Sequence, residues 1–286
     1  MAEVFDIITG IRRAVKAARA LGQSVGFVPT MGALHEGHAA LVRAAAARCD
    51  YVVVSVFVNP TQFGPNEDFA KYPRTLDADV QLCSTAGAKA IFAPGAAEMY
   101  PPGSRTIVEV EGLDRVLCGP KRPGHFRGVC TVVAKLFGIV QPDLAAFGAK
   151  DAQQSIILRR MVRDLDMPID MLIVPTVREA DGLAMSSRNR YLNAAERALA
   201  PRIYAALSEV ESSIRSGERR VVELERQLHD RLVAIPGARV DYASILDADD
   251  LTAKEKVEAP MIAAVAVFLG TTRLIDNILL NPHSTD

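Results

Sequence analysis

The chain has 286 residues, and its 33 lysines and arginines nearly balance its 34 aspartates and glutamates, giving a formal net charge of −1. This length predicts two domains, and the balanced charge argues against a nucleic-acid-binding protein, which usually carries a basic excess. The 4 cysteines lack C-x-x-C spacing, and the chain shows neither a signal-peptide pattern nor an apolar run of about 18 residues. We therefore expect a soluble cytoplasmic protein with no membrane or nucleic-acid partner.

Helical and strand patterns alternate over residues 1–175. Thr9 is expected to cap the first helix and Gly22 to end it. The alternation predicts a doubly wound, Rossmann-like parallel sheet with its functional site at the carboxyl ends of the strands. The pattern predicts helices at 10–21, 37–48, 75–86, 128–140 and 151–164, and strands at 24–28, 51–58, 88–94, 106–110, 144–147 and 169–175.

The pattern changes after Pro175. Asn193 and Glu196 have the spacing of a capping box, which predicts the start of a long helix that runs to about Arg215. A second helix, with leucines at 224, 228 and 232, precedes three strand-like runs at 239–246, 259–269 and 272–280. Residues 176–286 are therefore predicted to form a smaller α+β domain with a short antiparallel sheet, joined to residues 1–175 by a short hinge.

Residues 24–38, SVGFVPTMGALHEGH, run from an apolar strand through a turn into the start of a helix. His35 and His38 stand one helical turn apart at that start, where unpaired backbone N–H groups and the helix dipole attract an anion. Imidazole donors beside those amides can stabilise charge on a nucleotide's phosphates. The spacing differs from the H-E-x-x-H of zinc proteases, in which the histidines are four residues apart. We therefore interpret this segment as a phosphate site.

Three further polar segments are candidate sites. Asn59 and Gln62 follow the strand at 51–58, Lys150 and Asp151 open a helix after another strand, and 185–188 is a serine-rich loop with an arginine. Each also has a plainer interpretation. The first segment can be a loop that satisfies its own backbone, the second an exposed lysine with a helix-capping aspartate, and the third an ordinary polar loop.

The segment GPKRPGH at 119–125 has P-loop glycine spacing. His125, however, stands where a P-loop requires lysine, and Lys121 is misplaced. Lys121, Arg122 and Arg127 are equally well interpreted as a solvated loop.

Taken in order, these segments resemble a known family. PTMGALHEGH, VNPTQFGPNED, YPRT, HFRGV, GAKDAQQ and VPTVREADGLAMSSRN are similar to the H-x-G-H nucleotidylyltransferase superfamily, and within it to the pantoate–β-alanine ligases. The resemblance covers nearly the whole chain. It implies an ATP-dependent enzyme that converts pantoate to pantoyl adenylate and then to pantothenate with β-alanine, releasing pyrophosphate and AMP. It also implies Mg²⁺ with the ATP and a homodimer.

The resemblance implies residue roles as well. His35, His38 and Lys150 would be catalytic, Gln62 would bind pantoate and β-alanine, and Gln154 would bind pantoate. Residues 1–175 would bind nucleotide and pantoate, and residues 176–286 would form a lid. No residue is assigned as a direct metal ligand, although Asp77 and Asp79 are candidates for indirect contacts. The ATP-binding positions would be Met31, Gly32, Ala33, Leu34, His35, Glu36, Gly37, His38, Gly148, Ala149, Lys150, Asp151, Val177, Met185, Ser186, Ser187 and Arg188.

One departure and two alternatives accompany this hypothesis. The family pattern reads G-E-K-D where this chain has Ala149 in place of the glutamate. The first alternative is a simple nucleotidylyltransferase that transfers a nucleotide to a phosphorylated acceptor. The second is a nucleotide-binding regulator without turnover, which would be expected to have lost the histidines and the lysine.

Overall fold

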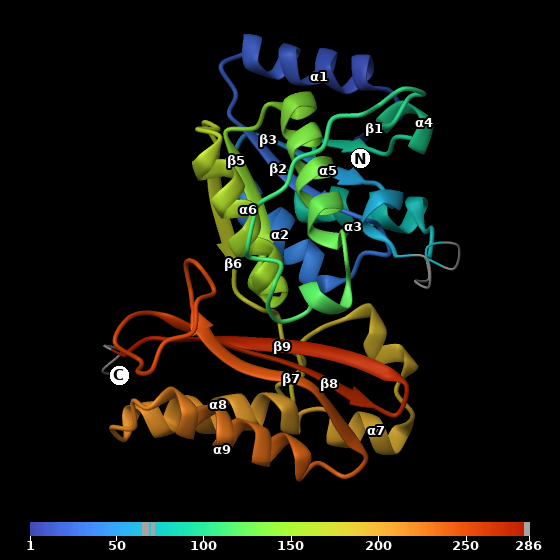
Figure 1. Cartoon of the computed structure of the whole chain (residues 1–286). Coiled ribbons are helices and arrows are strands. Elements are labelled where there is room, and N and C mark those ends of the chain that lie inside the picture. The colour runs from blue at the N-terminus through green and yellow to red at the C-terminus, as the bar shows by residue number, and fades with distance from the viewer. Residues whose placement is uncertain (65–68, 70–71, 283–286) are drawn as a thin grey trace. The chain divides into compact units, whose positions relative to one another are not determined.

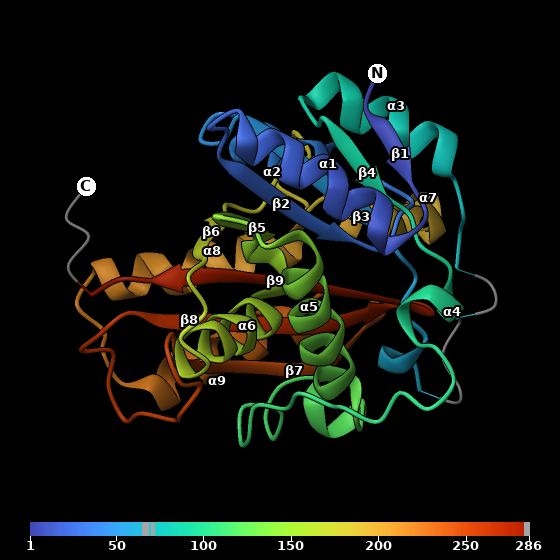
Figure 2. The ribbon, with the colours of Figure 1, turned by 90° about the horizontal axis from the view of Figure 1, so that it is seen from above.

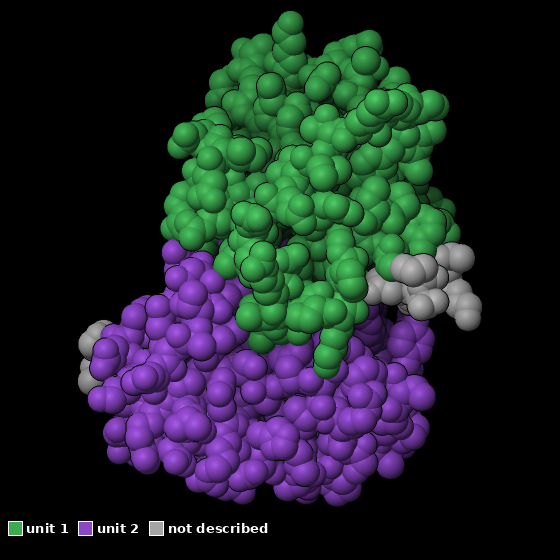
Figure 3. All heavy atoms as spheres, viewed as in Figure 1, with its two compact units in different colours: residues 1–148, 157–175 green, residues 149–156, 176–286 purple. Residues whose placement is uncertain are grey.

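A computed structural model describes residues 1–64, 69 and 72–282, so the end of the motif VNPTQFGPNED, at 65–68, lies outside the described residues. The chain divides into two compact units, coloured separately in Figure 3. The first unit is Met1–Gly148 with Ile157–Pro175, and the second is Ala149–Ile156 with Thr176–Asp286. The division of roles between residues 1–175 and 176–286 remains a prediction.

The first unit contains a six-stranded sheet in the order β1-β4-β3-β2-β5-β6 (Figure 1). Every neighbouring pair is parallel, which confirms the predicted doubly wound class. The chain leaves β2 toward β3 on one side and returns to β5 on the other, so the strand order reverses between β2 and β5. Ligands bind at such switch points, beyond the carboxyl ends of the strands. The strands are β1 (Glu3–Phe5), β2 (Val25–Thr30), β3 (Tyr51–Val56), β4 (Ala90–Phe92), β5 (Leu144–Gly148) and β6 (Asp170–Val174).

Helices connect these strands and cover the sheet. α1 packs against α5, and α2 packs against α3. Right-handed crossovers place these two pairs on opposite faces of the sheet, an arrangement that can be followed from above in Figure 2. The middle strands are buried on both faces, as their apolar sequences predict. The helices are α1 (Ile8–Ala20), α2 (Glu36–Ala46), α3 (Leu76–Ala86), α4 (Ala96–Met99), α5 (His125–Val140) and α6 (Ala152–Asp164), the last of which begins in the second unit.

Three details of the first unit differ from the sequence predictions. Thr9 is not a cap, because α1 begins at Ile8, two residues before the predicted start at residue 10, and the carboxylate of Glu98 accepts the N–H of Ile8 at 2.8 Å. Residues 106–110 form no strand, since the N–H of Val108 bonds instead to the hydroxyl of Thr131, on α5, at 3.0 Å. The three-residue strand β1 was too short to show a pattern.

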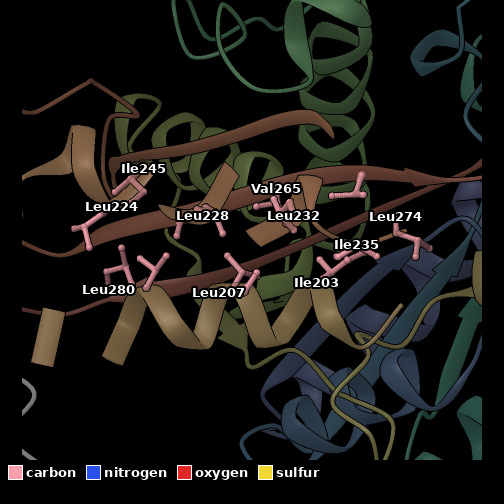
Figure 4. Packing of buried hydrophobic residues seen from close by; sticks show 14 of the residues in the cluster. Ile203, Leu207, Leu224, Leu228, Leu232, Ile235, Ile245, Val265, Leu274 and Leu280 are labelled. Atoms are coloured by element: carbon pink, nitrogen blue, oxygen red, sulfur yellow. The ribbon is translucent and has the colours of Figure 1, made fainter. Parts of the chain in front are cut away.

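The second unit has the predicted three-stranded antiparallel sheet, in the order β7 (Ala238–Asp247), β8 (Met261–Leu269), β9 (Thr272–Leu280). Helices α8 (Arg202–Arg215) and α9 (Val221–Val233) pack on it. Their apolar side chains meet those of the strands in the core that Figure 4 shows in close view.

The long helix expected from Asn193 to Arg215 is divided. The capping box is confirmed, with Asn193 and Glu196 bonded reciprocally at 2.9 and 3.0 Å, and it opens the short helix α7 (Ala194–Leu199). Helix α8 starts separately after Pro201. Proline has no N–H for a helical hydrogen bond, and its ring clashes with the preceding turn, which accounts for the break.

Candidate active site

A left-handed turn joins β2 to α2 at the carboxyl end of β2. Gly32 has φ +86° and Ala33 has φ +53°. The first angle favours glycine, and a Cβ at Gly32 would lie 3.0 Å from Val56 and 3.1 Å from the carboxylate of Asp79. Ala33 adopts the same region despite its side chain, so the surrounding structure must hold it there.

Asp79, on α3, supplies that hold. Its side chain is buried, with the residue 2% exposed, and its two oxygens accept the N–H groups of Ala33 at 3.1 Å and Leu34 at 2.8 Å. The hydroxyl of Thr75 donates to the same carboxylate at 3.2 Å. The sequence suggested Asp79 as an indirect metal contact, but these bonds give it a structural role in fixing the turn.

His35 and His38 cap the N-terminus of α2 with their own rings. Nδ1 of His35 accepts the N–H of Gly37 at 3.1 Å, and Nδ1 of His38 accepts the N–H of His35 at 3.3 Å. The ring centroids are 4.2 Å apart. Because Nδ1 of each ring accepts a bond, the proton of each neutral ring resides on Nε2, which makes Nε2 the donor. The predicted pair is therefore oriented as two N–H donors beside a helix N-terminus.

Gly37 explains the glycine of the H-x-G-H motif. A Cβ at this position would lie 2.9 Å from Cε1 and 3.0 Å from Nδ1 of His35. A side chain there would displace the ring and break its bond to the backbone. The glycine is needed for the histidine's position and not for an unusual backbone angle.

Gln62 lies at the end of a short 3₁₀ turn, Pro60–Gln62, just after β3. Asn59, which is 1% exposed, donates from Nδ2 to Oε1 of Gln62 at 3.1 Å. The hydroxyl of Tyr100 donates in turn to Oδ1 of Asn59 at 2.9 Å. This chain of bonds directs the Nε2 group of Gln62 toward the sulfur of Met31, 3.0 Å away. Two predicted site residues, Met31 and Gln62, are thus brought into contact.

His125 anchors the same turn, a role that sequence reasoning missed. Arg122 can only donate, and its guanidinium lies 2.9 Å from Nε2 of His125, so Nε2 accepts and Nδ1 carries the proton. Nδ1 then donates to the carbonyl of Gln62 at 2.8 Å. Gly128 allows this close approach, because a Cβ there would lie 2.4 Å from the carbonyl oxygen of Thr61. The solvated-loop interpretation is therefore wrong for Arg122.

In the second unit, Lys150 lies in a 3₁₀ turn, Ala149–Asp151, which precedes α6. The Nδ2 group of Asn277, on β9, donates to the carbonyls of Ala149 at 3.0 Å and Lys150 at 2.8 Å. Gln154 follows on the first turn of α6 and is half-buried.

A short hairpin carries the serine-rich loop of the second unit. Its strands pair through Arg178 and Ala184, and the N–H of Met185 donates to the carbonyl of Val177 at 2.9 Å. Oγ of Ser186 accepts the N–H of Arg188 at 3.2 Å and caps the 3₁₀ helix Ser187–Tyr191. These bonds bring the predicted residues 177 and 185–188 together.

The turn and the loop line one pocket. Its walls include two of the predicted cations and one buried carboxylate, from Lys150, Arg188 and Asp276. Burial raises the pKa of Asp276, and the neighbouring guanidinium of Arg178 partly opposes that shift. A second guanidinium on the wall, from Arg273, is already paired with Asp241 at 2.9 Å. Lys150 and Arg188 thus place two positive charges on the wall of this small pocket.

The two buried cysteines offer no activated nucleophile. Burial raises the pKa of Cys83 and of Cys130 to about 12, so both thiols stay protonated at neutral pH.

Within the described residues, no group of three or more His, Cys, Asp or Glu side chains is placed to hold a metal ion. No helix in that part of the chain has the length and apolar character needed to cross a membrane.

Comparison with known proteins identifies the family. A sequence model described as pantoate-beta-alanine ligase matches residues 3–279. The pantothenate synthetase of Moorella thermoacetica is 54% identical over 278 residues, covering 97% of this chain and 98% of the relative. That of Alcanivorax borkumensis is 54% identical over 274 residues, with 96% of each chain covered.

Solved structures agree. The pantothenate synthetase of Thermus thermophilus superposes with a TM-score of 0.92 at 47% identity, covering 98% of this chain and all of that one. The pantoate-beta-alanine ligase of Francisella tularensis, whose structure is described as a complex with beta-gamma ATP and beta-alanine, gives a TM-score of 0.78 at 33% identity, with 99% of this chain and 100% of that chain covered. The chain therefore belongs to the pantoate–β-alanine ligase family, whose members are enzymes that join pantoate to β-alanine with ATP.

Proposed function

We propose that this enzyme makes pantothenate in two steps, through pantoyl adenylate. A free carboxylate has no usable leaving group, so the carboxylate of pantoate first attacks the α-phosphorus of ATP and releases pyrophosphate. The amine of β-alanine then attacks the activated acyl carbon, and AMP leaves with the carboxyl oxygen that had attacked phosphorus. The family assignment favours this ligase over a simple nucleotidylyltransferase or a regulator without turnover.

The observation that carries the proposal is the geometry of the histidine turn. Two Nε2–H donors, from His35 and His38, lie at the N-terminus of α2, where the same two rings cap the N–H groups of Gly37 and His35. Preorganised donors of this kind stabilise the charge that develops on a departing pyrophosphate. We assign the backbone of Met31–His38 to ATP binding on this basis.

Gln62 supplies the substrate amide in this scheme. Its Oε1 is occupied by Asn59, so Nε2 is the atom that we assign to binding the carboxylate or hydroxyls of pantoate and, in the second step, β-alanine. Gln154 remains the second proposed pantoate ligand.

Lys150 supplies a positive charge for the triphosphate, and Arg188 adds a guanidinium that suits phosphate oxygens. We further propose that Gly148, Ala149, Asp151, Val177, Met185, Ser186 and Ser187 complete the ATP contacts. Residues 1–175 would then bind the substrates, and residues 176–286 would act as a lid.

Mg²⁺ is proposed to arrive with ATP. Asp79 is committed to backbone amides, so it does not fit a role as a metal ligand. The triphosphate itself offers the oxygen ligands that Mg²⁺ prefers. A cytoplasmic location, where ATP is abundant, and a homodimeric state complete the proposal.

Exchange of labelled pyrophosphate into ATP tests the two-step scheme. Pantoate should support this exchange without β-alanine, because the first step is complete before the amine is needed. AMP release should require β-alanine. An absolute requirement for the amine in the exchange reaction would contradict the adenylate intermediate, and transfer of AMP to a phosphorylated acceptor would favour the nucleotidylyltransferase.

A further inference from the structure

Strand β9 has two adjacent buried polar residues, Asp276 and Asn277, before the apolar run that ends it. Asp276 is 5% exposed and Asn277 is 7% exposed. Both N–H bonds of the Asn277 amide are used, one on the carbonyl of Ala149 and the other on that of Lys150. One side chain therefore holds two consecutive carbonyls of the turn that bears Lys150.

Asp276 bonds to the backbone of Asn277 and to Arg178. Its carboxylate accepts the backbone N–H of Asn277 at 2.8 Å and a two-pronged pair of bonds from Arg178 at 2.7 and 3.0 Å. Tyr204 stacks on Arg178, with the guanidinium carbon 3.6 Å from the ring centroid. Such a planar, bidentate pair has little freedom to reorient.

The same guanidinium bonds within the hairpin that carries the serine-rich loop. Arg178 also donates to the carbonyl of Gly182 at 3.1 Å, inside the hairpin that leads to Ser186. The Lys150 turn and the hairpin that carries the 185–188 loop are thus both bonded to one short stretch of β9, and the turn and the loop line one pocket.

We infer that Asn277 is a positioning residue for Lys150, and that the Arg178–Asp276 pair keeps Asn277 in place for that task. The inference rests on the proposed role of Lys150 in adenylation. Asn277 itself would touch no substrate. Its effect would be to place the lysine turn so that the Lys150 ammonium meets the phosphates at the distance that the transition state requires, and a misplacement of about 1 Å costs up to about 100-fold in rate.

The main variants are Asn277→Ala, which removes both donors, and Asn277→Asp, which keeps the size but turns the donors into acceptors facing two carbonyls. Each should lower the rate of pantoyl adenylate formation about 10- to 100-fold at saturating MgATP and pantoate. The KM for β-alanine and the rate at which supplied pantoyl adenylate reacts with β-alanine should stay within about twofold of wild type, because the donors hold the phosphate lysine only. If Asn277→Ala does not fold, Asn277→Asp carries the test.

The decisive measurement is a double-mutant cycle. If Asn277 acts through Lys150, then adding Asn277→Ala to Lys150→Ala should change adenylation by less than about twofold. An equal loss in both backgrounds, or a single Asn277 variant as fast as wild type, would overturn the inference. Failure of the proposed function looks different, because Lys150→Ala alone would then leave adenylation intact.

Leu280→Val is the matched control for loosening of the strand. Leu280 lies on the same strand and is fully buried in the core of the second unit, away from the lysine turn. This variant should lower the melting temperature without slowing adenylation. A loss of adenylation in Leu280→Val as large as that in Asn277→Ala would reduce Asn277 to an ordinary structural residue.

Discussion

The turn at His35–His38 and the turn at Ala149–Asp151 are both proposed to bind the phosphates of ATP, yet the protein holds them in different ways. In the first, the imidazole rings bond to amides two and three residues away. In the second, the backbone carbonyls of the turn are bonded by Asn277, which lies 127 and 128 residues further along the chain. A change to a histidine thus alters chemistry and local structure together, whereas a change to the lysine side chain leaves the bonds on the backbone of its turn in place.

Lys150→Ala should give the largest effect. Loss of the ammonium should slow pantoyl adenylate formation by about 10²- to 10³-fold, as expected when a group that stabilises developing charge is removed. The melting temperature should not change, because Asn277 still holds the turn. Adenylation is measured by rapid quench at saturating MgATP, with Lys16→Ala, an exposed lysine on α1, as the control. Near-normal adenylation would transfer the role of phosphate cation to Arg188, Lys121 or Arg127.

His38→Ala should combine two smaller losses. The transition state should lose about 2–4 kcal/mol of stabilisation with the Nε2–H donor. The free energy of unfolding should fall by about 0.5–2 kcal/mol, the usual cost of removing a helix cap. Adenylation kinetics and urea unfolding measure the two losses, and His229→Ala, on the exposed face of α9, is the control. Unchanged adenylation would return His38 to a purely structural role.

Gly37→Ala tests whether the position of the His35 ring matters for adenylation apart from its effect on stability. The added Cβ would lie 2.9 Å from the His35 ring, so the ring must move and adenylation should slow about 10-fold. Stability should change little, because alanine favours a helix over glycine by about 1 kcal/mol and loss of the His35 cap costs about as much.

Gly138→Ala is the matched control, because Gly138 is an exposed helical glycine whose added Cβ would meet nothing within 4 Å. It should stabilise the protein and leave adenylation unchanged. Full activity in Gly37→Ala would show that the ring of His35 need not stay where the structure places it.

Features set by residues that are neighbours in the sequence could be predicted, and features set by distant residues could not. The histidine turn was predictable, because a strand, a turn and a helix start are encoded within residues 24–38. The β–α alternation likewise predicted the parallel sheet, and the change of pattern after Pro175 predicted the second sheet.

The errors arose where distant residues decide the structure. Val108 lies in an alternating run, but its N–H bonds to a hydroxyl on α5 and not to a strand. His125 resembled a failed P-loop because its partner is the distant carbonyl of Gln62. Asn277 gave a weak signal, as one of two adjacent polar residues in an apolar strand, but its partners lie more than 120 residues away. Pro201 was a local signal for the helix break that the prediction did not use.

The smallest expected effect concerns Ala149, which stands where the family pattern has glutamate. The side chain at 149 is not what holds the turn, because Asn277 bonds to the backbone carbonyl of this residue. Ala149→Glu should therefore leave the maximal rate of adenylation unchanged and alter the KM for MgATP by no more than about threefold, since a water can fill the place of the missing carboxylate. The measurement is an ATP titration of pantoyl adenylate formation beside wild type. A 10-fold or greater change in the maximal rate would mean that the side chain at 149 helps to place Lys150. The lysine turn would then be positioned by a residue next to it in the sequence, as the histidine turn is.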